Sequence, residues 1–163
     1  MMRKLRRPPR IKVLEASGAI GDGRVHILDE SEGGAFARVR SSDASREYVV
    51  VVRKSGSTAF RVYSDDNGTK YRGYVGYPII AVMMLLGFLP RDNYVEKALS
   101  GIPWKELNEK FKKYELVERF IREKLANTID WSIIEDFRRR VLGVLGRYNI
   151  YLDPTLAGKP ATP

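Results

Sequence analysis

The residues best suited to chemistry are the cations at the start of the chain. The first twelve positions hold no Asp or Glu and six cations, namely Arg3, Lys4, Arg6, Arg7, Arg10 and Lys12. Lysine and arginine neutralise nucleic-acid phosphates and release their counterions. Because no carboxylate lies within the segment, it predicts a nucleic-acid-binding arm. The alternative interpretation is a solvated terminus.

Basic and aromatic residues alternate along three predicted strands, and alternate residues of a strand share one face of a sheet. The residues that share a face in this way are Phe36 with Arg38 and Arg40, Arg61 with Tyr63, and Lys70 with Arg72 and Tyr74. Aromatic rings stack on unpaired bases and arginines hold phosphates, so these sets predict a second nucleic-acid surface. The alternative is an ordinary solvated face in which arginine stems cover the rings.

The pattern of charged residues in the second half of the sequence indicates a stabilising role and not a binding site. They form six i, i+4 pairs in the favourable order, which are Glu106/Lys110, Glu109/Lys113, Glu115/Arg119, Glu118/Arg122, Glu135/Arg139 and Asp136/Arg140. Arg138 is left without a formal partner. Residues 94–111 have the outline of a helix-turn-helix around Gly101, but Lys97 stands where close packing favours a small side chain. Two packed helices are therefore the favoured interpretation.

Catalytic and metal-binding patterns are absent from the sequence. The chain has no cysteine and one histidine, His26, which excludes thiolate chemistry and multi-histidine metal sites. No phosphate-binding loop, zinc-protease or serine-hydrolase motif occurs. Asp65 and Asp66 precede an Asn-Gly turn, and adjacent strand residues point to opposite faces, so the two carboxylates should not converge. We expect no catalytic residue, no metal and no cofactor, and we favour a non-enzymatic protein.

Five short strands should present these residues. Turn signals separate them at residues 24–28, 35–40, 46–53, 58–64 and 69–75. The Asn67-Gly68 pair is typical of a hairpin, and short loops indicate an antiparallel meander. In the third strand, Val49 and Val51 are expected to face the core.

Helices should flank the strands. A short helix is predicted after Pro9, and residues 78–88 are apolar nearly all round, which predicts a helix buried under the sheet. A short helix over 94–99, a long amphipathic stretch from Pro103 to Leu125 and a helix capped by Asp130 follow. The predicted fold class is α+β, an antiparallel β-meander of about five strands with a buried helix on one face and a C-terminal helical half.

Length and composition indicate one domain. The 163 residues are 44% hydrophobic and carry a net charge of +9. We expect a flexible basic arm over 1–10, a single domain over 11–152 (11–77 mainly sheet, 78–152 helical) and a disordered tail over 153–163. No apolar run reaches the ~20 residues of a membrane span, so we expect a cytoplasmic protein without a membrane partner. The scarcity of Cys, Gln and Met beside abundant Lys, Arg and Glu is typical of hyperthermophile, archaeal-like proteins.

The distribution of charge suggests the function. The first twelve residues contribute +6 and residues 38–77 contribute +4 of the net +9, while residues 13–37 subtract 4. We therefore predict a non-enzymatic protein that binds DNA or RNA through the arm and, second, through the sheet. The alternative is a subunit or adaptor of a homo- or hetero-oligomeric assembly, with apolar helices forming the interface.

Overall fold

A six-stranded sheet organises the chain in the computed structural model, which describes residues 2–158. The strand order is β1-β6-β5-β4-β3-β2, and the strands are β1 (Arg3–Lys4), β2 (Val25–Ser31), β3 (Gly34–Arg40), β4 (Glu47–Lys54), β5 (Ala59–Ser64) and β6 (Asn149–Leu152). Strands β2 to β5 form the predicted antiparallel meander. Strand β6 adds to it in parallel beside β5, and β1 is antiparallel to β6.

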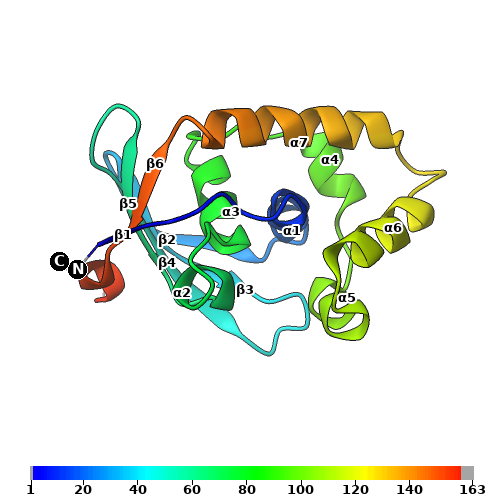
Figure 1. The fold of residues 1–163 in the computed structure, drawn as a ribbon, viewed down its shortest axis with the longest axis horizontal. Helices are drawn as coiled ribbons and strands as arrows, with labels where there is room; N and C mark the ends of the chain where they lie inside the picture. The colour runs from blue at the N-terminus through cyan, green and yellow to red at the C-terminus, as the bar shows by residue number, and fades with distance from the viewer. Residues whose placement is uncertain (1, 159–163) are drawn as a thin grey trace.

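Helices cover one face of the sheet and continue beyond it (Figure 1). They are α1 (Ile11–Gly21), α2 (Asn67–Lys70), α3 (Tyr77–Leu85), α4 (Asn93–Ala98), α5 (Trp104–Phe111), α6 (Tyr114–Lys124) and α7 (Trp131–Leu145), with a 3₁₀ helix at Pro154–Ala157. The predicted α+β fold class is confirmed. Within the described part of the chain, no helix combines the length and apolarity that crossing a bilayer requires.

The buried helix α3 is the centre of the core. Ile79, Ile80 and Met83 are fully buried between the sheet and α1. Strand β4 contributes Val50 and Val52 to this core. Of the two valines predicted in the core, Val51 is buried but lies outside the cluster that contains Val50 and Val52, and Val49 is only partly buried. Residues 49–52 are all valine, so apolar and polar residues do not alternate there and the sequence does not indicate which valines point toward the helices.

The predicted fifth strand, residues 69–75, is also wrong. Its expected hairpin turn is instead the first turn of α2, because Asp66 has extended backbone angles and its carboxylate accepts a hydrogen bond from the Thr69 backbone N–H at 3.1 Å. The Ser64 hydroxyl also donates to Asp66. An aspartate that caps a helix satisfies free N–H groups there and so competes with the turn. After α2 the chain is irregular, and Tyr74 forms an isolated parallel bridge with Arg6.

Both termini are more ordered than predicted. The expected flexible arm is anchored: Leu5 N–H donates to the Ile150 carbonyl at 2.8 Å, Arg6 N–H donates to the Gly73 carbonyl at 2.9 Å, and Leu5 is buried. A single leucine among cations is too weak a pattern to predict this strand. In the expected disordered tail, Pro154–Ala157 forms the 3₁₀ helix beside β5. Residues 159–163 lie outside the described residues.

The amphipathic stretch after Pro103 forms two helices where one was expected. Lys112 ends α5 in the left-handed region at φ 60°, and Lys113 is extended before α6 begins. The two helices then pack against each other through the rings of Phe111 and Phe120, whose centroids are 5.7 Å apart. This break lets α5 approach α1, where Asn108 donates to Glu15, while Glu118 of α6 accepts from Arg138 of α7.

Candidate nucleic-acid interface

The N-terminal segment crosses one face of the molecule as it passes from β1 to α1 (Figure 1). Its first arginine, Arg3, donates to the backbone carbonyls of Thr69 and Lys70 at 3.3 and 3.4 Å. Arg6 donates to the carbonyl of Arg72. These bonds bring cations from the two predicted sets side by side, although nearly 70 positions separate them in the sequence.

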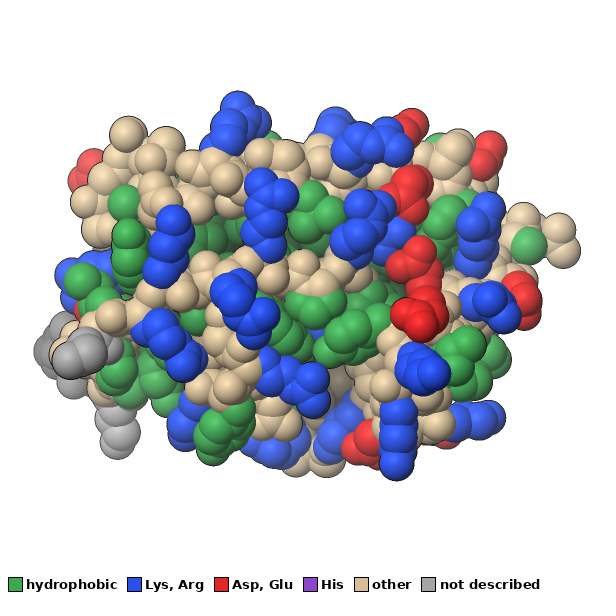
Figure 2. All heavy atoms as spheres, in the orientation of Figure 1, with side chains coloured by type: hydrophobic (Ala, Val, Ile, Leu, Met, Phe, Trp, Pro, Cys, Tyr) green, Lys and Arg blue, Asp and Glu red, His purple; other side chains and the backbone are tan. Residues whose placement is uncertain are grey.

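Six cations therefore share this part of the surface, which we call the basic face: Arg3, Lys4, Arg6, Arg7, Lys70 and Arg72. All six are exposed. No ion pair in residues 2–158 involves any of them. In Figure 2, Lys and Arg side chains gather over this face, and the acidic side chains lie mostly to the right, over the helical half.

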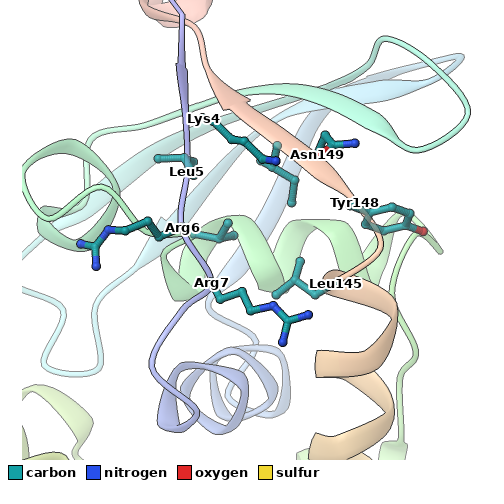
Figure 3. Close-up of a pocket in the computed structure, with 10 residues that line it drawn as sticks. Lys4, Leu5, Arg6, Arg7, Leu145, Tyr148 and Asn149 are labelled. Atoms are coloured by element: carbon teal, nitrogen blue, oxygen red, sulfur yellow. The ribbon is translucent and has the colours of Figure 1, made fainter.

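A hollow of about 410 Å³ borders the basic face between the N-terminal segment and the end of α7. Figure 3 shows Lys4 and Arg7 directed toward it, with Leu145 and Asn149 on its far wall, while Arg6 points to the opposite side. The Arg7 guanidinium lies against Gly146, at the C-terminal end of α7. Free carbonyls at a helix C-terminus attract cations, so this contact helps to fix Arg7 in place.

The remaining two predicted arm residues are engaged elsewhere. Arg10 pairs with Glu135 of α7. Lys12 is buried, with its Nζ 2.6 Å from Glu15 Oε2 and above the ring of Tyr114. Burial lowers the pKa of Lys12, but the charge and hydrogen bond of Glu15 outweigh it, and the net pKa is raised. Lys12 is therefore charged but not available to a phosphate.

The predicted sheet residues share the face of the sheet opposite to the helices. Arg38 and Arg40 alternate with core-facing residues of β3, as Arg61 and Tyr63 do in β5. Each of the three arginines contacts a carboxylate, although Arg38 and Arg40 share a single one. Glu47 lies 2.9 Å from Arg38 and 3.8 Å from Arg40, and Asp153 lies 2.7 Å from Arg61.

The third predicted set does not lie in a strand. Lys70 ends α2 and Arg72 follows it, and both belong to the basic face. Tyr74 is buried, with its hydroxyl 3.3 Å from the hydroxyl of Tyr114.

Sequence reasoning missed a cavity of about 350 Å³ beside the basic face. It lies where α1, α5 and α6 meet the segment around α2. We call it the tyrosine cavity, and the residues that characterise it are Tyr48, Tyr74, Tyr77, Tyr114, Trp104, Lys12, Glu15, Asp66 and Asn108. Asn108 Nδ2 donates to Glu15 Oε1 at 2.9 Å, which extends the Lys12–Glu15 pair toward α5.

Several of the groups that line this cavity have shifted pKa values. Burial raises the pKa of Asp66 above its ordinary value despite hydrogen bonds from Ser64 and Thr69. Burial also raises the pKa of Tyr48, Tyr74 and Tyr77. All three tyrosines are therefore neutral hydrogen-bonding groups at neutral pH. Such clustering in a hollow is typical of functional sites, although structural networks also produce it.

The sequence contained one signal for the cavity. Lys12 and Glu15 stand three residues apart in a helix that is otherwise apolar on the same side, and a charged pair at that spacing can be buried together. The contributions of Tyr48, Tyr77 and Asn108 depend on tertiary packing, and no local pattern marks them.

Comparison with known proteins gives one match. The model of the family described as "uncharacterised conserved protein UCP014422" matches residues 5–151. No curated protein and no solved structure matches the chain. The matched residues include Arg6, Arg7, Lys70 and Arg72 of the basic face and every residue that characterises the tyrosine cavity, whereas Arg3 and Lys4 of β1 precede the match.

Proposed function

The chain belongs to this family, whose description states no activity, and we propose that it is a non-enzymatic nucleic-acid-binding protein. The observation that carries the proposal is the basic face, six exposed cations without a carboxylate partner among the described residues. Each such cation can neutralise a phosphate and release counterions.

The backbone of the basic face supports this function. Because β1 pairs with β6 and Arg3 and Arg6 bind the segment around α2, the cations are held in a fixed arrangement before any ligand arrives. A pre-ordered surface loses less conformational entropy on binding than a flexible arm does. The opposite face of the sheet is a weaker candidate, because Arg38, Arg40 and Arg61 already contact Glu47 or Asp153.

Salt-dependent binding tests the proposal. Fluorescence anisotropy would compare single-stranded RNA, single-stranded DNA and duplex DNA of about 12 nucleotides, within the range of one small binding module. The variant Lys4→Gln/Arg72→Gln removes two charges whose side chains form no hydrogen bond in residues 2–158. The control Lys97→Gln/Lys124→Gln removes two exposed charges from α4 and α6. The slope of log affinity against log salt is negative, and each lost phosphate contact makes it less steep by about 0.7 on single strands. We therefore expect the slope of the variant to be less steep than that of the wild type by about 1.4.

Two results would overturn the proposal. One is that the wild-type protein fails to bind any of the three nucleic acids at low salt. The other is that the variant and its control have the same affinity and slope. The alternative predicted from the sequence, an assembly subunit, would give the first of these results together with self-association or a co-purifying protein.

A further inference from the structure

The tyrosine cavity has the aromatic lining of a site for a flat ring. Four tyrosines and Trp104 contribute to its walls, and they come from elements on both sides: β4, α3, α5, α6 and the segment after α2. Tyr48 and Tyr77 meet edge to face, with ring centroids 6.3 Å apart. Its volume of about 350 Å³ lies within the range of sites that hold small molecules.

The charges in the cavity wall balance, so the cavity favours an uncharged ligand. Lys12, Lys105 and Arg72 are matched by three carboxylates, those of Glu15, Asp66 and Glu109. The innermost charges already have partners, since Lys12 pairs with Glu15 and Asp66 accepts from Thr69. A charged ligand would have to break these contacts in a buried setting, which is costly.

The cavity also offers hydrogen-bonding groups of both kinds. Asn108 Oδ1 is buried and has no hydrogen-bond partner within residues 2–158, so it is a free acceptor. The hydroxyls of Tyr74 and Tyr114 share at most one hydrogen between them, which leaves a second hydrogen for a ligand. A neutral, flat molecule with donors and acceptors on its edge matches these groups. Nucleobases have this chemistry, and proteins read unpaired bases by stacking and edge hydrogen bonds.

The cavity is continuous with the basic face. Arg72, Tyr74 and Tyr114 line both the cavity and the shallow hollow beside Arg6 and Arg7. A strand whose phosphates lie on the basic face would therefore have its bases at the cavity mouth. We propose that the tyrosine cavity binds one unpaired nucleobase. If the base belongs to a bound strand, this inference rests on the proposed function. If the base belongs to a free nucleoside, the inference is independent of the proposed function.

Abasic substitution distinguishes these two sources. Single-stranded oligonucleotides with one abasic site at successive positions would be compared with the intact strand, and adenosine, guanosine, cytidine and uridine would be titrated alone. If a strand base enters, one abasic position should weaken binding about tenfold, the loss expected from one stacked base. If a free nucleoside is the ligand, the nucleosides should bind and the abasic strands should bind like the intact one.

Variants connect the result to the cavity. Tyr114→Ala removes a ring from the mouth and should weaken binding of the intact strand about tenfold without changing the salt slope, because no phosphate contact is lost. If a strand base enters the cavity, abasic and intact strands should bind this variant with the same affinity. If a free nucleoside is the ligand, this variant should no longer bind it. Tyr114→Phe retains the ring and should retain most of the affinity. Tyr94→Ala, an exposed tyrosine of α4, is the matched control. Thermal unfolding of each variant would establish that it folds.

The outcomes separate the two proposals. Strand binding that is insensitive to abasic sites and to Tyr114→Ala, with no nucleoside bound, would overturn the cavity inference and leave the proposed function standing. Nucleoside binding without strand binding would overturn the proposed function and support the cavity inference. Absence of both would overturn both.

Discussion

Arg138 of α7 binds Glu118 of α6 through two parallel hydrogen bonds, 2.7 Å from Nη1 to Oε1 and 2.9 Å from Nη2 to Oε2. Glu135 accepts two further bonds from the same guanidinium. The Arg138 side chain is 2% exposed, whereas those of Glu118 and Glu135 are 29% and 26% exposed. One buried cation held by two half-buried carboxylates therefore joins α6 to α7.

Replacing this arginine should destabilise the helical half. In Arg138→Met the carboxylates lose their shared partner, but they can be rehydrated because each is partly exposed. The expected loss is about 2 kcal/mol in the free energy of unfolding, below the 3–5 kcal/mol for breaking a fully buried pair. The adjacent Arg139 pairs with Asp136, and both side chains are 70% exposed, so Arg139→Met should change stability by less than about 0.5 kcal/mol. Urea unfolding measures both, and equal stability of the two variants would contradict the assignment.

The same contact predicts a pH dependence. Hydrogen bonding to Arg138 lowers the pKa of Glu135 below its ordinary value of 4.5. At pH values between the folded-state and unfolded-state pKa of Glu135, the unfolded chain binds more protons than the folded protein. The stability that Glu135 contributes is therefore complete above pH 4.5 and is lost as the pH falls through the folded-state pKa. Glu135→Gln should therefore reduce the loss of stability that occurs as the pH falls below 4.5. Glu123→Gln, at an exposed glutamate of α6, is the control, and an unchanged loss of stability at acid pH in Glu135→Gln would count against the contact.

Arg138 also shows where sequence reasoning stopped. The i, i+4 pattern predicted that it had no partner and that Glu118 and Glu135 paired with other arginines. The rule treats one helix at a time, and the partner here lies on a different helix. None of the six predicted pairs is an ion pair in the described structure, where Arg139 instead binds Asp136 at i, i+3.

Elements with several agreeing local signals were predicted well. The buried helix from Pro78 had proline at its first turn and apolar residues all round, and Asp130 caps α7 as expected by accepting from Ser132. Residues 69–75 had conflicting signals, since Asn-Gly favours a hairpin and Asp66 favours a helix cap. In the structure Asp66 caps the helix and is buried beside Ser64, so the helix forms and the hairpin does not. Burial depends on the whole fold and is not visible in the local sequence.

The candidate site was predicted only in part. Sequence alone identified all six cations of the basic face, because charge is visible in composition. It could not predict that Arg3 and Arg6 reach the segment around α2, since that depends on β1 joining β6 across the whole length of the chain. The tyrosine cavity was missed for the same reason, because its walls come from α1, β4, α3, α5, α6 and the segment around α2.

Two glycines in helices should respond to alanine with opposite signs. At Gly18 of α1 a Cβ would lie 2.7 Å from Trp104 Nε1 and 3.0 Å from the Leu99 carbonyl oxygen, so α1 or α5 would have to move. At Gly143 of α7 a Cβ would meet nothing within 4 Å. Gly18→Ala should therefore lower the free energy of unfolding by about 1–3 kcal/mol. Gly143→Ala should raise it by about 0.5–1 kcal/mol, because alanine is the better helix former. Thermal unfolding of both measures the difference, and stabilisation by Gly18→Ala would show that α5 is not packed on α1.

Leu5 tests whether the basic face is ordered before it binds. Leu5 is 6% exposed and lies in the core, so Leu5→Ala should lower the free energy of unfolding by about 2 kcal/mol, at the lower end for a core leucine because the strand is at the sheet edge. Met2→Ala, at a residue 52% exposed, should change it little. Leu5→Ala leaves the net charge unchanged, so a flexible arm would bind nucleic acid as before. An anchored segment would instead lose affinity as its cations gain freedom, because binding must then order them. Anisotropy at one salt concentration, together with hydrogen exchange at the Leu5 and Arg6 amides, distinguishes the two behaviours.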